Sequence, residues 1–170
     1  MSRLMRILKH RSYDEADVRR VLDDSALKRL EARVHDSEKK HSGEIRLCIE
    51  AGLPTSYIWK RLSVRDRALS MFGKLRVWDT EHNNGVLIYL LYAEHKIEIV
   101  ADRGLKSRVS DADWQTIVER MREPLRLGNF EQGLILAIAA VEVLLEQHFA
   151  VSAGADAANP NELRNKPWIG

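Results

Sequence analysis

Residues 44–50 read Glu-Ile-Arg-Leu-Cys-Ile-Glu, and polar and apolar side chains alternate along the whole stretch. A period of two is typical of a β-strand with one apolar face, so we predict a strand here. Residues 86–92 read Val-Leu-Ile-Tyr-Leu-Leu-Tyr, an almost wholly apolar run that indicates a strand buried on both faces. The segment between them, residues 63–75, has a capping signal and an apolar stripe at helical spacing.

A strand, a helix and a strand in this order form a right-handed crossover, which makes the two strands parallel. Residues 97–101 follow a short turn and predict a third strand that returns antiparallel to the second. Helical patterns precede this unit and follow it. The sequence therefore predicts an α/β fold, a three-layer α/β/α sandwich whose small mixed sheet has a parallel pair plus an antiparallel hairpin strand.

Composition narrows the class of protein. The chain has 170 residues with 45% apolar and 31% charged side chains, the proportions of one globular domain. A single cysteine, Cys48, excludes an intramolecular disulfide framework and a cysteine zinc cluster. Aromatic residues amount to 6% and are not interleaved with basic ones, so the pattern gives no support for nucleic-acid binding.

Three regions are expected along the chain. Residues 1–24 form a basic and helical N-terminal extension, residues 25–150 form the domain, and residues 151–170 are small and polar, as in a flexible tail. Basic residues interrupt the N-terminus every few positions, so no secretory signal is visible and we expect a cytoplasmic location. Residues 1–11 predict a short amphipathic helix, which either packs on the domain or makes a weak contact with a membrane surface.

The predicted topology gathers polar residues at one end of the sheet, where two strands begin and the third ends. Glu44, Asp79, Glu81, Asn84 and Asp102 all belong to this end. Clustered carboxylates repel one another unless a cation or a proton intervenes, and calcium and magnesium prefer oxygen ligands of this kind. We therefore consider a divalent-metal site with Asp79, Asn84 and Asp102 as ligands, and Glu44 or Glu81 as a ligand or a supporting group.

The alternative is that these side chains only stabilise turns. Asp79 and Asn83 would then bond to nearby backbone amides, and Asp102 would pair with Arg103 or Arg108. The spacing does not match the twelve-residue calcium loop or another known metal motif, so both interpretations remain open at this point.

The chain resembles the TPM domain family over roughly residues 25–150. The residues that carry the resemblance occur in the order of the family: Ser42-Gly43-Glu44-Ile45-Arg46, Asn84-Gly85-Val86-Leu87-Ile88-Tyr89-Leu90, Val100-Ala101-Asp102-Arg103-Gly104-Leu105, Trp114, Phe130 with Gly133, and His148-Phe149. It looks most like a cytosolic bacterial branch of that family.

The resemblance implies an α/β/α sandwich and, in some members, a divalent-cation site at the end of the sheet. A plant thylakoid relative is described as an acid phosphatase, and bacterial relatives have no settled activity. The positions that match the family are Glu44, Asn84 and Asp102, whereas Asp79 and Glu81 depend on the topology argument alone.

Two functions follow from these observations. The first is a non-enzymatic module that binds calcium or magnesium and interacts with protein partners, including membrane-associated ones, through the region of Tyr57 and Trp59 or through the basic N-terminus. The second is a metal-dependent phosphatase acting on phosphomonoesters, in which the cation polarises a phosphoryl oxygen and Arg103 neutralises phosphate charge. No complete catalytic set is visible in the sequence, which favours the first.

Overall fold

The computed structural model describes residues 3–151, 159 and 161–170. The helices are α1 (Arg3–Arg11), α2 (Glu15–Val21), α3 (Asp24–Glu38), α4 (Thr55–Trp59), α5 (Val64–Lys74), α6 (Arg103–Lys106), α7 (Asp111–Arg126) and α8 (Phe130–Phe149), with a short 3₁₀ helix η1 (Tyr92–Glu94). The strands are β1 (Glu44–Glu50), β2 (Gly85–Leu91), β3 (Lys96–Ala101) and β4 (Trp168–Ile169).

The strands form one mixed sheet in the order β3-β2-β1-β4. Strands β1 and β2 are parallel, with Glu44 opposite Gly85, and β3 returns antiparallel to β2, with Ala101 opposite Val86. The predicted parallel pair and antiparallel hairpin strand are therefore confirmed. The fourth strand, β4, pairs parallel to β1 and was not predicted.

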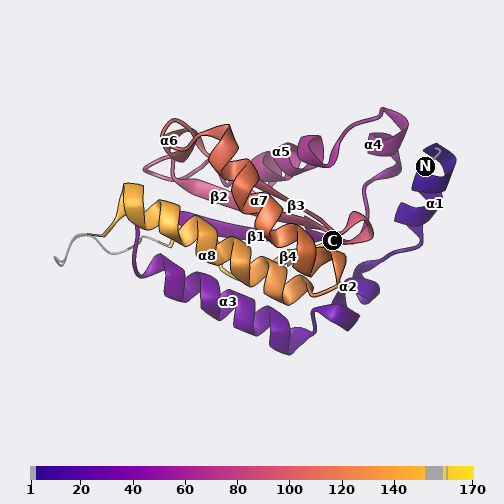
Figure 1. The fold of residues 1–170 in the computed structure, drawn as a ribbon, viewed down its shortest axis with the longest axis horizontal. Coiled ribbons are helices and arrows are strands. Elements are labelled where there is room, and N and C mark those ends of the chain that lie inside the picture. Colours follow the sequence, from indigo (N-terminus) through magenta and orange to yellow (C-terminus); the bar gives the residue numbers. More distant parts are fainter. Residues whose placement is uncertain (1–2, 152–158, 160) are drawn as a thin grey trace.

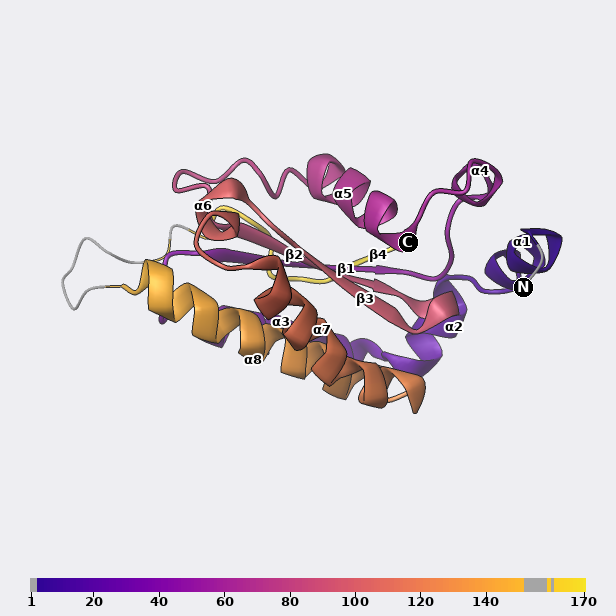
Figure 2. The same cartoon turned by 45° about the horizontal axis from the view of Figure 1, so that its top comes forward.

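Helices cover both faces of the sheet, as the three-layer prediction required. Figure 2 shows α5 on one face and α3, α7 and α8 on the other, and Figure 1 shows α8 lying between α3 and α7. The alternation in β1 explains the division, because Ile45, Leu47 and Ile49 belong to the core cluster on the α8 side and Cys48 to the cluster on the α5 side. Burial raises the pKa of the Cys48 thiol, which keeps it protonated and unreactive.

A buried polar group holds α5 to the sheet. The Arg67 guanidinium donates to both carboxylate oxygens of Glu50, at 2.8 and 2.5 Å, and the Tyr89 hydroxyl donates to Glu50 at 2.7 Å. All three residues are buried, so the charges of Arg67 and Glu50 depend on each other for compensation. The group fixes where α5 lies along β1 and β2.

Helix α8 is long and apolar enough, by length and composition alone, to cross a membrane. Its inner face, however, supplies Leu134, Ile138 and Val141 to the core. Glu142 is also buried on it and accepts hydrogen bonds from Arg33 at 2.6 Å and Lys40 at 2.8 Å. We therefore describe α8 as the core helix of the domain, as the sequence predicted.

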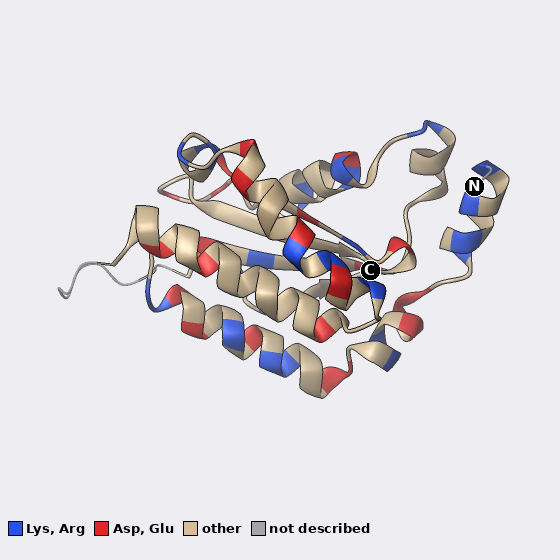
Figure 3. Cartoon of the chain, in the orientation of Figure 1, with Lys and Arg blue, Asp and Glu red and all other residues tan. Residues whose placement is uncertain are grey.

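The N-terminal residues form an amphipathic helix that lies at one end of the molecule (Figure 1). Figure 3 marks the Lys and Arg positions along this helix, α1, in blue. Arg6 and His10 bond to the Glu94 carboxylate at 2.8 and 3.0 Å, and the Leu53 N–H donates to the other ring nitrogen of His10 at 2.9 Å. Leu4 remains exposed, whereas Ile7 packs against the core cluster on the α5 side, so α1 is docked through Ile7 as well as through Arg6 and His10.

The expectation of a flexible tail over residues 151–170 is wrong for residues 161–170, which we call the C-terminal segment. This segment runs along the outer edge of β1 and ends in β4, where Gly170 exchanges backbone hydrogen bonds with Ile49 and Ala51. The small, polar composition of the preceding residues gave no sign of this strand pairing. Residues 152–158 and 160 lie outside the described part of the chain.

Candidate functional site

Three strands meet at the end of the sheet where the sequence predicted a site. Glu44 of β1 lies opposite Gly85 of β2, and the Asp102 N–H donates to the Gly85 carbonyl at 2.9 Å. Glu44, Gly85 and Asp102 thus form one row across β1, β2 and the end of β3. Residues opposite one another in a sheet point to the same face, so the two acidic side chains flank Gly85 on the α5 side.

Gly85 leaves room for a backbone oxygen between these two acidic residues. A Cβ at Gly85 would come within 2.0 Å of the Val77 carbonyl oxygen. The loop after α5 therefore lies directly over Gly85, and only glycine permits this close approach. The Val77 carbonyl is an oxygen ligand of the kind that calcium accepts.

Asp102 has one satisfied and one unsatisfied carboxylate oxygen. Its Oδ1 accepts a hydrogen bond from the Arg103 N–H at 2.7 Å and so caps α6. Its Oδ2 is buried and has no hydrogen-bond partner among the described residues. Arg103 does not pair with this carboxylate, because its Nε donates to the Asn83 side chain at 2.8 Å.

Glu44 is held by the C-terminal segment. Its side chain is fully buried, and its two carboxylate oxygens accept hydrogen bonds from the N–H groups of Glu162 at 3.0 Å and Leu163 at 3.1 Å. Burial raises the pKa of Glu44, and these two backbone donors act against that shift. Both oxygens therefore already have protein partners.

Asn84 lies just before β2, at the same end of the sheet, but its side chain is directed to the other face. It directly precedes Gly85, so strand alternation turns its side chain toward the α8 side, where its amide donates to the Ser42 carbonyl at 3.0 Å. Asn84 is 1% exposed, and its Oδ1 has no hydrogen-bond partner among the described residues. The structure thus brings Asn84 and Asp102 to one end of the sheet but not to one face.

The two remaining predicted residues lie outside this row. Asp79 is exposed and pairs with Arg76 at 2.5 Å. Glu81 is also exposed, and its N–H lies 3.2 Å from both carboxylate oxygens of Glu162. Within residues 3–151, 159 and 161–170, no three His, Cys, Asp or Glu side chains form a group that could hold a metal ion by themselves.

A buried acid that was not among the predicted site residues lies next to this end of the sheet. Glu38, at the end of α3, accepts a hydrogen bond from the Ile45 N–H at 2.9 Å, and its other oxygen, Oε2, has no partner among the described residues. Burial raises the pKa of Glu38 to about 8, and the nearby charge of Glu44 adds to the shift. The signal was present, because Leu30, Val34 and Glu38 follow one another at intervals of four on the buried side of α3.

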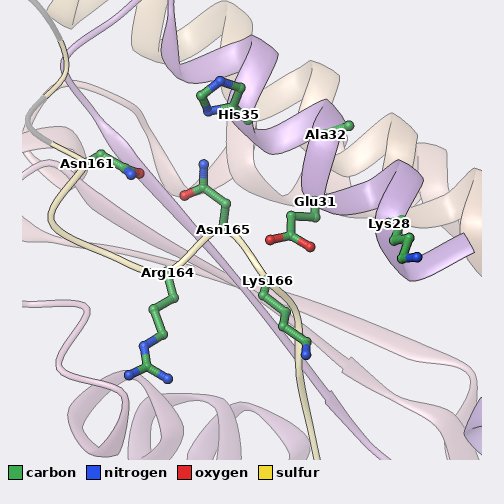
Figure 4. Close-up of a pocket in the computed structure, with 8 residues that line it drawn as sticks. All are labelled: Lys28, Glu31, Ala32, His35, Asn161, Arg164, Asn165 and Lys166. Atoms are coloured by element: carbon green, nitrogen blue, oxygen red, sulfur yellow. The ribbon is translucent and has the colours of Figure 1, made fainter. Parts of the chain in front are cut away.

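A cleft of about 630 Å³ lies between α3 and the C-terminal segment (Figure 4). In Figure 4, Glu31 points from α3 toward the segment, whereas the Arg164 side chain points away on the other side of it. Lys28 and Lys166 also line the cleft. Its charges are mixed and do not converge on one point, so we assign no ligand to it.

Comparisons with known proteins agree with this architecture. The family model of the TPM domain matches residues 14–144. This range includes α2, which the sequence prediction assigns to the N-terminal extension. No curated protein is similar enough to count as a match.

Among solved structures, the NMR structure of the BA42 protein from the psychrophilic bacterium Bizionia argentinensis is similar, with 31% sequence identity and a TM-score of 0.73. The similarity covers 86% of this chain and 93% of that one. The chain belongs to the TPM domain family.

Proposed function

We propose that the protein is a divalent-cation-binding domain that acts by binding rather than by catalysis, with Asp102 as the principal charged ligand. The observation that carries this proposal is the Asp102 Oδ2 atom, which is buried and has no hydrogen-bond partner among the described residues. Asp102 pairs with Gly85 across the sheet, so its side chain lies on the face of the sheet that the Val77 carbonyl covers.

An unsatisfied buried oxygen needs a physical explanation. Leaving a buried acceptor without a partner costs about 1–3 kcal/mol, and more when the acceptor is charged. A bound cation removes that cost. Calcium and magnesium both take carboxylate and backbone carbonyl oxygens, and water molecules complete their coordination. Asp102 and Val77 are the protein groups that would hold the ion here, whereas both carboxylate oxygens of Glu44 already accept hydrogen bonds from the C-terminal segment.

The test is a calorimetric titration of the full chain with calcium chloride and, separately, magnesium chloride. Asp102→Asn keeps the shape of the side chain and its capping oxygen but removes the charge, so we expect it to abolish saturable binding. Asp79→Asn is the matched control, because Asp79 is exposed and paired with Arg76. Equal binding by the wild type and Asp102→Asn would reject the proposal.

The alternative is a metal-dependent phosphatase at the same end of the sheet. The observation that favours it is the neighbour of Asp102, since the Arg103 side chain is exposed next to the proposed cation. An arginine beside a metal can bind a phosphoryl group through charge-assisted hydrogen bonds. Turnover of p-nitrophenyl phosphate that EDTA and Asp102→Asn both abolish would support the phosphatase. We expect no turnover above the buffer rate.

A further inference from the structure

The two outer edges of the sheet differ. The outer edge of β1 is covered by the C-terminal segment, whose backbone is bonded along most of its length. The outer edge of β3 has no neighbouring strand within the described residues. An uncovered edge presents a row of backbone donors and acceptors that can pair with another extended chain.

The register shows which groups face outward from β3. The bonded pair of Asp102 with Gly85 fixes the alternation, so Ile97, Ile99 and Ala101 direct their N–H and C=O groups away from β2. The Arg65 guanidinium donates to the Ile99 carbonyl, which confirms that this group faces outward. Among the described residues, this is the one hydrogen bond formed on the outer side of β3.

This edge is the floor of a second cleft, with a volume of about 970 Å³. Ile99 and Ala101 of β3 line the floor, Arg65 lines the α5 side, and Trp114 and Val118 line the α7 side. Figure 2 shows how the two walls arise, because α5 and α7 lie on opposite faces of the sheet. The strand edge is therefore recessed between two helices.

We propose that this groove binds an extended segment of a partner protein, which adds to the sheet as a strand beside β3. An extended polypeptide is the ligand that offers donors and acceptors at the spacing of Ile97, Ile99 and Ala101. A second copy of this chain fits less well, because its own β3 is recessed between the same two helices. This inference adds a partner to the proposed binding role and does not depend on the cation site.

The walls specify the side chains of that segment. Successive residues of an added strand point alternately to the two faces, so one set meets Trp114 and Val118 and the other meets Arg65 and Glu98. The charged residues that line the groove are three acids and two bases: Glu98, Asp111, Glu119, Arg65 and Lys106. Asp111 and Glu119 belong to the α7 wall, so we expect basic residues toward α7, with their aliphatic stems against Trp114, and apolar residues at the alternate positions.

Arg65 competes with the partner for the edge. Its guanidinium bonds to the Ile99 carbonyl and lies 3.5 Å from the Glu98 carboxylate, so an incoming basic strand must displace it. Arg65 in this position protects a strand edge in the way that charged side chains commonly do. Arg65→Ala should raise the affinity for the partner segment about threefold, since one competing hydrogen bond is removed.

The test uses the full chain labelled with ¹⁵N and a blocked hexapeptide of alternating valine and lysine. We expect saturable shifts of the amide resonances in Lys96–Ala101 and in the first half of α7. The same peptide with N-methylated valines keeps the side chains but loses donors, and it should not bind. Equal binding of the two peptides, or no shifts in β3, would overturn the proposal.

Two variants locate the contact. Ala101→Pro removes an outward N–H while the bonds of β3 to β2 remain, and proline is tolerated on edge strands, so we expect about three- to tenfold weaker binding. Glu119→Lys changes an exposed residue in the groove and should weaken binding of the basic peptide, whereas Glu123→Lys, one turn further along α7, should not. Equal effects of the two lysine variants would contradict the proposal. So would peptide-free dimerisation through β3, measured by sedimentation and abolished by Ala101→Pro.

Discussion

Glu44 and Arg46, two residues apart on the same face of β1, bind opposite backbone groups of one extended segment. Glu44 accepts from the N–H groups of residues 162 and 163, and Arg46 donates to the carbonyls of residues 164 and 166. The polar side of β1 therefore holds the C-terminal segment through its backbone. Both residues are buried by that contact, so their charges depend on it.

Replacing Arg46 should loosen the C-terminal segment. Arg46→Met keeps the length of the side chain but removes the donors to two carbonyls, and charge-assisted hydrogen bonds contribute about 1.5–3 kcal/mol. We expect the free energy of unfolding to fall by about 2 kcal/mol. Hydrogen exchange at residues 161–170 should become faster, while β2 stays protected.

Arg164→Met is the control for that experiment, because the carbonyl of Arg164 makes the contact and its side chain is exposed. Its exchange rates should match the wild type. Unchanged protection of residues 161–170 in Arg46→Met would show that the segment is held by β4 pairing alone.

Replacing Gly85 or Gly73 by alanine should change the free energy of unfolding in opposite directions. A Cβ at Gly85 would meet the Val77 carbonyl at 2.0 Å, so Gly85→Ala must displace the loop over the sheet and should cost about 1–3 kcal/mol. Gly73 lies near the end of α5 with nothing within 4 Å of the added carbon, so Gly73→Ala should gain up to about 1 kcal/mol. Urea unfolding of the two variants measures both values, and a neutral Gly85→Ala would contradict the close approach.

Glu38 should make stability fall as the pH rises. Its pKa is about 8 in the folded protein, above the ordinary value of 4.5, because the carboxyl is buried. Between these two values the folded state binds a proton that the unfolded state does not, so the free energy of unfolding decreases with pH by up to about 1.4 kcal/mol per unit. The contribution is complete below pH 4.5 and is lost by about pH 8.

Glu38→Gln keeps the acceptor for the Ile45 N–H and cannot ionise. Unfolding curves at pH 5, 6.5 and 8 should therefore give similar free energies of unfolding for the two proteins at pH 5. At pH 8 the variant should be the more stable of the two. If wild type and variant showed parallel pH profiles, Glu38 would not be the titrating group.

The order of layers could be predicted because it follows from patterns inside single elements. The strict alternation of residues 44–50 and the apolar run 86–92 specify which side chains are buried, and the crossover rule then makes β1 and β2 parallel. β4 could not be predicted in this way. It has two residues, and its pairing with β1 depends on contacts with Arg46 and Glu44 that lie more than a hundred residues away.

The same distinction applies to the site. Topology correctly placed Glu44, Asn84 and Asp102 at one end of the sheet. Sequence spacing could not show that Glu44 is occupied by the C-terminal segment, that Asp79 pairs with Arg76, or that Asn84 is directed to the other face. Each of these three contacts depends on which group lies within hydrogen-bonding distance of a side chain, and strand order alone does not determine that.

The most direct test of the cation proposal is chemical-shift mapping of the ¹⁵N-labelled full chain during titration with calcium chloride and then magnesium chloride. An ion at Asp102 should shift the amides of residues 77–79, 85 and 102–104 in a saturable way and leave β4 unchanged. Asp102→Asn should abolish these shifts. Their absence in the wild type, or their persistence in Asp102→Asn, would contradict the assignment of Asp102 as the ligand.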